Sequence, residues 1–137
     1  MSHANVELVR RALEHLRESY VAGTATEGLL DLCSPEIRVD ASRRVFNPDV
    51  YVGEAGIRRS IREICEAWEE FNERTEGLID AGDRVVVLQT ISGRGRVSKA
   101  HVEQKGALIW TVRDGRVKLI EVFGDPCEAL KTAGLES

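Results

Sequence analysis

Residues 97–123 read VSKAHVEQKGALIWTVRDGRVKLIEVF, and this stretch decides the fold. Apolar and β-branched residues are frequent on both sides of Asp114-Gly115, a pair typical of two-residue hairpin turns. Strands joined by so short a turn must be antiparallel. The stretch therefore predicts a hairpin with strands over Val97–Arg113 and Arg116–Phe123.

The same pattern extends toward the N-terminus. Two more runs rich in Val, Ile, Leu and Thr, Arg74–Asp80 and Arg84–Ser92, are separated by Ala81-Gly82-Asp83. The next segment, Gly93-Arg94-Gly95-Arg96, lacks the strand-to-helix context of a phosphate-binding loop and indicates a hairpin turn. The four runs together predict an antiparallel meander.

Three helices are predicted before the meander, because apolar residues recur there every three or four positions. Asn5 would cap the first helix, Gly23 would follow its end, and Pro35 would stop the short second helix. The apolar faces would consist of Val6, Val9, Leu13, Leu16 and Tyr20 in the first helix, Leu29, Leu30 and Leu32 in the second, and Ile57, Ile61, Ile64, Trp68 and Phe71 in the third.

The remaining segments complete an α+β pattern. Glu36–Asp40 reads as a short strand, and residues 41–53 have no periodicity and read as a loop. Asp125-Pro126 suits the start of a last helix, with Asp125 as its N-cap. Helices kept apart in sequence from an antiparallel meander indicate the α+β class.

Both faces of the strand that contains Trp110 are apolar. Leu108 and Trp110 point to one face, while Ala107 and Ile109 point to the other. One face can cover the helices. The other predicts contact with a second subunit, and hence a homodimer, unless its small side chains simply tolerate exposure.

The composition limits the classes of function. Hydrophobic residues make up 42% and charged residues 31% of the 137, and the net charge is -4 with no basic block, so nucleic-acid binding is not expected. No apolar run approaches the roughly 18 residues of a membrane span, and no signal peptide is evident, which predicts a cytoplasmic protein without membrane contact. The three scattered cysteines and the lack of ligand spacing predict reduced thiols, no metal and no cofactor.

Several local strings are similar to those of one known group of proteins. They are YVGEAGIR at residues 51–58, DAGDRV at 80–85, IWTVRDGRV at 109–117 and the segment Phe123–Leu135. Together they resemble the nuclear transport factor 2-like superfamily, and within it the SnoaL-like domains related to polyketide cyclases.

The resemblance covers nearly the whole chain and implies one domain over residues 1–137. It implies a cone-shaped, curved antiparallel sheet wrapped around the N-terminal helices, an α+β barrel of the nuclear transport factor 2-like or cystatin-like type. Such domains are usually dimeric and hold a deep apolar cavity. The superfamily includes isomerases, cyclases, hydrolases and binding modules, so the fold alone does not give the reaction.

Two carboxylates are the candidates for catalysis, because burial in an apolar cavity raises a carboxyl pKa and makes it a useful base. Glu121 shares a strand face with Leu119 and Phe123, and by resemblance to ketosteroid isomerase that face lines the cavity. Asp40 lies within one residue of the position of that enzyme's general base. The alternatives are that Glu121 points to solvent and that Asp40 caps the loop after it.

The predicted pocket lining combines strand, helix and loop residues: Trp110, Leu108, Phe123, Leu119, Tyr51, Trp68 and Leu16. By resemblance, Leu16 and Leu108 stand where ketosteroid isomerase has its catalytic tyrosine and its hydrogen-bonding acid, so steroid isomerisation is not expected. Tyr20 and Tyr51 are possible hydroxyl donors, although Tyr20 is expected instead to pack one turn further along the first helix.

The loop with Phe46 lies where a lid could cover the cavity mouth. Its Arg43 or Arg44 could bind an acidic substrate group, although solvated loop arginines are commoner.

Three functions remain open. The first is a cofactor-independent enzyme of polyketide-cyclase type, acting on a small apolar molecule through Glu121 or Asp40. The second is a non-catalytic module that binds such a molecule. The third is a dimerisation scaffold.

Overall fold

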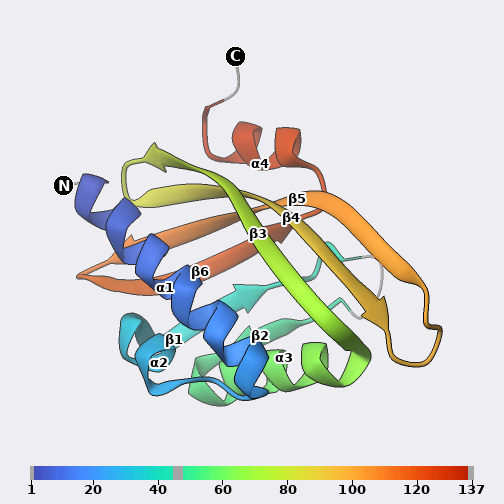
Figure 1. The fold of residues 1–137 in the computed structure, drawn as a ribbon. Helices are drawn as coiled ribbons and strands as arrows, with labels where there is room; N and C mark the ends of the chain where they lie inside the picture. The colour runs from blue at the N-terminus through green and yellow to red at the C-terminus, as the bar shows by residue number, and fades with distance from the viewer. Residues whose placement is uncertain (1, 45–47, 136–137) are drawn as a thin grey trace.

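The structure is a computed structural model that describes residues 2–44 and 48–135. It confirms the α+β class (Figure 1). In chain order the elements are α1 (Ser2–Ala22), α2 (Glu27–Leu32), β1 (Cys33–Asp40), β2 (Val50–Val52), α3 (Gly53–Ala67), β3 (Trp68–Ala81), β4 (Arg84–Gly95), β5 (His101–Arg113), β6 (Arg116–Phe123) and α4 (Pro126–Thr132).

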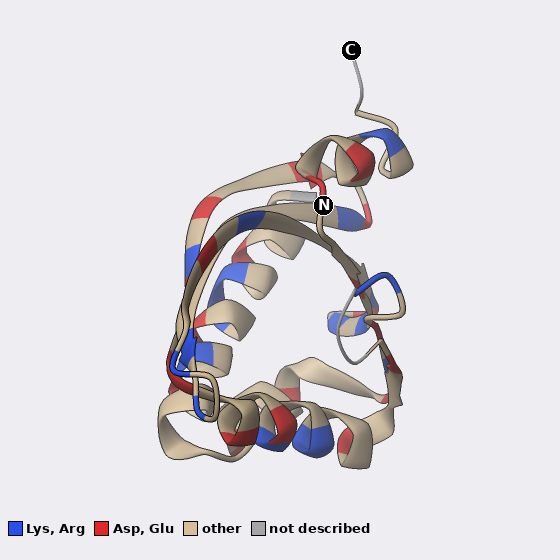
Figure 2. Cartoon of the chain, turned by 90° about the vertical axis from the view of Figure 1, so that its right-hand side faces the viewer, with Lys and Arg blue, Asp and Glu red and all other residues tan. Residues whose placement is uncertain are grey.

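The strands form one six-stranded sheet in the order β2-β1-β6-β5-β4-β3. The pair of β1 with β6 is parallel, and the other neighbouring pairs are antiparallel. Figure 2 shows the sheet curving over an interior beside which α1 and α3 lie, while α4 lies outside near the C-terminus. The predicted meander is therefore confirmed as β3 to β6.

The sheet has two apolar faces. The inner face, packed against α1, α2 and α3, includes Val85, Val87, Leu108 and Trp110. The outer face carries the smaller core cluster, Val86, Ala107, Ile109 and Phe123 with Ala129 and Ala133 of the chain's C-terminal part. The sequence predicted that a second subunit would cover this outer face. In the structure, α4 and the residue after it cover the face at these strand positions. The homodimer stays a prediction.

The third helix is shorter than predicted. It ends at Ala67, and both Trp68 and Phe71 belong to β3. A β-bulge lies between Glu69 and Asn72, where Glu70 has a φ of 57°. An extra residue in a strand changes the alternation of side chains. Because of this bulge, Trp68 and Phe71 lie on the same face of the sheet although they are three residues apart. That spacing is also typical of a helix, which is why the sequence predicted one.

Other boundaries also differ from the predictions. Asn5 lies within α1 instead of capping it, and its Nδ2 donates to the carbonyl of Gly82 at 3.1 Å. The predicted loop at 41–53 contains β2, which pairs with β1. Gly93 to Gly95 lie in β4, and the turn follows them. Phe46, in the proposed lid, lies outside the described residues. Asp125 is the N-cap of α4, as predicted, and accepts from the Cys127 N–H at 3.0 Å.

Candidate functional site

The two carboxylates predicted to be catalytic lie on the outer face. Glu121 pairs with Ile109, whereas Trp110 pairs with Ile120 on the inner face. Paired residues of adjacent strands point to the same side, and a shift of one residue reverses the side. The prediction that Glu121 shares an interior with Trp110 is therefore wrong, and Leu119, opposite Thr111, is on the outer face too.

Asp40 neighbours Glu121 across the parallel pair of β1 and β6. Arg43 lies 3.8 Å from a carboxylate oxygen of each, and its guanidinium is 4.2 Å from the centre of the Phe123 ring. The hydroxyl and the N–H of Ser42 donate to Asp40 Oδ1 and hold the pKa of that carboxyl below its ordinary value. Asp40 therefore organises the loop after β1, which is the alternative left open by the sequence.

The inner face holds a different set of polar groups, of which Glu73 is the central one. Glu73 lies opposite Ile91 on β4, two residues after Phe71 on β3. Burial raises its pKa to about 7, opposed by the positive charge of Arg17 on α1. Its Oε1 is buried and has no hydrogen-bond partner. Near neutral pH, the neutral and the ionised form of the Glu73 carboxyl are therefore both populated.

Tyr20, near the end of α1, lies beside this carboxyl. Its ring meets that of Phe71 edge-on, with centres 5.1 Å apart, and the centre of the Trp68 ring is 6.2 Å from that of Phe71. Burial first, and then the negative charge of Glu73, raise the pKa of Tyr20 well above its ordinary value. The hydroxyl therefore keeps its proton and can act only as a neutral hydrogen-bonding group.

A second group of polar side chains joins the β1–β2 loop and β2 to α3. The Tyr51 hydroxyl donates to Glu63 Oε1 at 2.7 Å and accepts from Arg44 Nη2 at 3.0 Å. Arg59 Nη1 donates to Glu63 Oε2 at 3.1 Å and to Asp49 Oδ2 at 2.8 Å. The hydrogen bond from Tyr51 and the charge of Arg59 hold the pKa of Glu63 below its ordinary value. These contacts fix Arg44 and Tyr51 in place.

The two groups meet at Tyr20, because both Arg44 and Glu73 act electrostatically on its hydroxyl. In the part of the chain that the structure describes, three buried side-chain N or O atoms have no hydrogen-bond partner, namely Arg44 Nε, Glu73 Oε1 and Trp110 Nε1. Unpaired buried polar atoms are rare and call for an explanation. We name Tyr20, Arg44, Tyr51, Glu63 and Glu73 the inner polar cluster.

Trp110 lies away from this cluster. It pairs with Val85, whereas Glu73 pairs with Ile91 six residues further along β4. Six residues of extended chain span roughly 20 Å. Of the predicted lining residues, Tyr51 belongs to the cluster, and Trp68 joins it through Phe71. Leu16 and Leu108 pack in the inner core, and Phe123 lies on the outer face.

Sequence reasoning missed Glu73 because it placed Phe71 in a helix. If Phe71 had been assigned to a strand, the alternation of side chains would have put Glu73 on the same face. The sequence offered Arg43 and Arg44 as equivalent loop arginines, because no local signal indicates which of the two turns toward the interior.

A separate hollow lies elsewhere on the molecule. It has a volume of about 500 Å³ and lies between α2, the start of β1 and the start of α3, with Arg116 at its rim. None of the predicted site residues and none of the three unpaired atoms line it. Burial raises the pKa of Cys33 in its wall to about 11, so that thiol is neutral. The inner polar cluster is therefore the better candidate site.

Two further kinds of feature are absent from residues 2–44 and 48–135. No helix there is long and apolar enough to cross a membrane. No three His, Cys, Asp or Glu side chains there are grouped so that they could hold a metal ion.

Comparisons with known proteins add a family and a fold. The model of the SnoaL-like domain matches residues 9–120. A comparison with curated proteins found no match. An NTF2-like protein from Burkholderia xenovorans is similar in structure, with a TM-score of 0.75, 22% identity and 97% of each chain covered.

Two other solved structures are informative. TerC, co-crystallised with polyporic acid, gives a TM-score of 0.73 at 19% identity, over 96% of this chain and 98% of TerC. A protein from a Jannaschia species, assigned as a SnoaL-like polyketide cyclase, gives 0.70 at 20% identity, over 98% of this chain and 94% of that one. These likenesses show an NTF2-like fold.

Proposed function

The chain belongs to the SnoaL-like domain family, and from this premise we propose that it binds a small, largely apolar molecule at the inner polar cluster and exchanges a proton with it through Glu73. One observation carries this proposal. The Glu73 carboxyl is enclosed by protein, has a pKa raised to about 7 and leaves one oxygen unpaired. Such a group is costly for stability, and a role in binding or catalysis is the simplest reason for its presence.

The chemistry that these residues support is acid–base catalysis without a cofactor. Near neutral pH, an ionised Glu73 can accept a proton from a carbon atom next to a carbonyl group, and the protonated form can return it elsewhere on the molecule. Tyr20 keeps its proton and can donate a hydrogen bond to a developing oxyanion. Phe71 and Trp68 supply flat apolar surface beside these groups.

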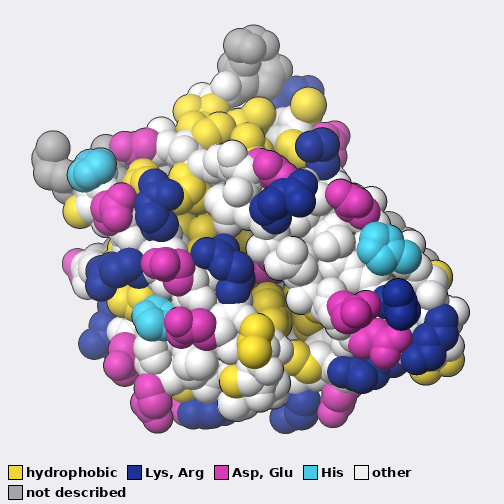
Figure 3. Space-filling model, in the orientation of Figure 1, with side chains coloured by type: hydrophobic (Ala, Val, Ile, Leu, Met, Phe, Trp, Pro, Cys, Tyr) yellow, Lys and Arg dark blue, Asp and Glu magenta, His cyan; other side chains and the backbone are white. Residues whose placement is uncertain are grey.

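Glu73 takes the role that was predicted for Glu121 or Asp40, because both of those carboxylates lie on the outer face. The distant neighbours support small-molecule binding by this fold, since TerC was co-crystallised with polyporic acid. Figure 3 shows hydrophobic side chains at the surface between α1 and β3, where a largely apolar molecule would approach the cluster.

A non-catalytic binding module is the second candidate. It is favoured by the apolar side chains of Leu16 and Leu108, which pack in the inner core and give no hydrogen-bond donors. Under this alternative, Tyr20 and Glu73 hydrogen-bond a ligand that leaves chemically unchanged.

Deuterium exchange in heavy water distinguishes the two candidates. The protein would be screened by thermal shift against flat aromatic ketones, and each ketone that stabilises it would be followed by NMR for loss of the proton next to the carbonyl. We expect exchange by the wild type and a loss of about 100-fold or more in Glu73→Gln, the usual effect of removing a general base. Glu121→Gln, on the outer face, should exchange like the wild type.

Unchanged exchange in Glu73→Gln would contradict the assignment of Glu73. Binding without any exchange by the wild type would favour the non-catalytic module.

A further inference from the structure

Arg44 has an unused hydrogen-bond donor in the interior. Its Nη2 donates to the neutral Tyr51 hydroxyl, and its Nε is buried without a partner. The nearest carboxylate along this chain of contacts, Glu63, is hydrogen-bonded by both Tyr51 and Arg59. Within the described residues, no carboxylate forms an ion pair with Arg44, although its positive charge contributes to the lowered pKa of Asp49. Arg44 is half-buried, and it is its Nε–H that is buried without a partner. Burying an unpaired donor is costly, and a bound anion would complete its hydrogen bonding.

The neighbouring arginine shows the contrast. Arg43 is next to Arg44 in sequence but lies on the outer face, where it approaches both Asp40 and Glu121 and stacks on Phe123. Arg43 thus contacts two carboxylates and an aromatic ring. Arg44 also lies over an aromatic ring, that of Tyr51 at 5.8 Å, but among the described residues it has no carboxylate in an ion pair and its Nε–H has no partner.

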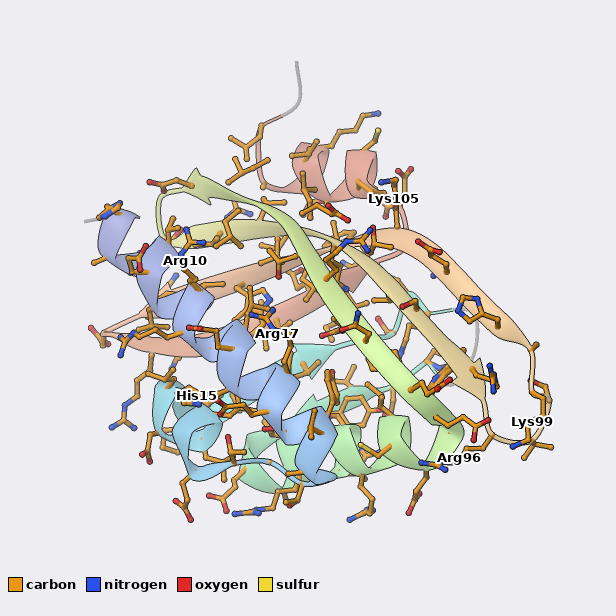
Figure 4. The ribbon with its side chains drawn as sticks, in the orientation of Figure 1. Arg10, His15, Arg17, Arg96, Lys99 and Lys105 are labelled. Carbon is orange, nitrogen blue, oxygen red and sulfur yellow. The ribbon has the colours of Figure 1, made fainter. Side chains whose placement is uncertain are left out.

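The balance of charges around the cluster favours the binding of an anion. Three cations, Arg17, Arg44 and Arg59, are near it, and two carboxylates, Asp49 and Glu63, have lowered pKa values and are ionised. Arg17 lies on the side of α1 that faces β3, and His15 lies on the other side (Figure 4). Cys65 and Tyr20, the other titratable groups acting here, are kept neutral by burial. With Glu73 protonated, these three cations and two carboxylates, in and around the cluster, leave one positive charge in excess.

We propose that Arg44 binds the anionic group of the ligand, so that the inner polar cluster selects organic acids, with a carboxylate at Arg44 Nε and an apolar body against the rings of Tyr20 and Phe71. This rests on the proposed function and adds to it the class of ligand. An anion at Arg44 leaves Glu73 free to act on another part of the same molecule. Arg17, at the surface between α1 and β3, adds attraction for an incoming anion.

Matched acids and amides test the selection. Benzoate, 2-naphthoate and biphenyl-4-carboxylate would each be compared with the corresponding primary amide at pH 6, where Glu73 is mostly protonated. Dissociation constants would come from calorimetry, and the NMR signals of the Tyr20 ring would show whether binding occurs at the cluster. We expect at least one acid to bind tenfold or more tightly than its amide.

Three variants locate the effect. Arg44→Gln should bring the ratio of acid to amide affinity close to one. Arg44→Lys keeps the positive charge but loses the planar guanidinium, so it should retain part of the preference for acids. Arg43→Gln is the matched control and should keep the wild-type ratio. Circular dichroism and the melting temperature would confirm that each variant is folded, and the lysine variant provides a test if the glutamine variant is not.

Two results would overturn the proposal in distinguishable ways. If the amides bind at the Tyr20 ring as tightly as the acids, the selection of acids is wrong but small-molecule binding at the cluster stands. If neither acids nor amides perturb the Tyr20 ring, both proposals fail. A ratio that is unchanged in Arg44→Gln and lost in Arg43→Gln would place the anion on the outer face instead.

Discussion

Glu73→Gln is expected to be more stable than the wild type at pH 8 by about 3 kcal/mol. Burial raises the pKa of Glu73 to about 7 from an ordinary value of 4.5. Each unit of difference between folded and unfolded pKa corresponds to about 1.4 kcal/mol. Because the amide cannot ionise, the variant avoids the cost of burying the charged form.

The sign of the pH dependence follows from proton binding. Between about pH 4.5 and 7 the folded protein holds the Glu73 proton while the unfolded chain releases it, so the wild type loses stability as the pH rises through this range. The stability of Glu73→Gln lacks this decline. The difference between the two proteins should be small at pH 4.5, grow up to pH 7 and then stay constant.

Urea unfolding at several pH values measures this difference. Glu121→Gln is the matched control, since its carboxyl lies on the outer face near Arg43. A stability difference that does not vary with pH would contradict a raised pKa for Glu73. A less stable Glu73→Gln at pH 8 would show that the charged carboxylate is well accommodated. Stability lost for the sake of a functional group is a common feature of active sites.

Trp110→Ala is expected to lose about 3–5 kcal/mol of stability, the usual cost of removing a large aromatic side chain from a core. Trp110 is completely buried, in the inner core with Val85 and Val87. Chemical denaturation at pH 6 would measure the loss. If Trp110 instead lined a pocket, its removal would enlarge an existing space, and the loss would be much smaller.

Trp110→Phe separates the ring from its N–H group. The Nε1 atom is buried without a hydrogen-bond partner, so replacing the ring by phenyl breaks no hydrogen bond and removes an unpaired polar atom. We expect the Phe variant to lose about 1–2 kcal/mol, clearly less than Ala, with ligand affinity at the inner polar cluster unchanged. Equal losses for Ala and Phe would contradict the assignment of Trp110 to the core.

The sequence was a good guide wherever local chemistry determined the backbone. Asp114-Gly115 makes a tight turn, with φ angles of 53° and 73°, and the alternation around Trp110 predicted the two faces of β5 correctly. The Asp125 cap also formed as expected. In each case the signal lies within a few residues, so tertiary packing had little opportunity to change it.

The candidate site was harder to predict, because it depends on register and on contacts distant in sequence. A one-residue difference in register moved Glu121 to the outer face. The bulge at Glu70 made the start of β3 resemble a helix and concealed Glu73. Nothing local distinguishes Arg43, which contacts Glu121 on the outer face, from Arg44, which contacts Tyr51 on the inner side.

Titration of Glu73 by NMR tests whether burial raises the pKa of this carboxyl, on which its proposed role depends. The side-chain carboxyl carbons of protein labelled with ¹³C-glutamate would be followed by NMR from pH 3 to 9, and the signal missing in Glu73→Gln would be assigned to Glu73. We expect a midpoint near 7 that moves when a ligand binds. A midpoint near the ordinary 4.5, unaffected by any ligand that binds, would contradict the role of Glu73 and of the inner polar cluster.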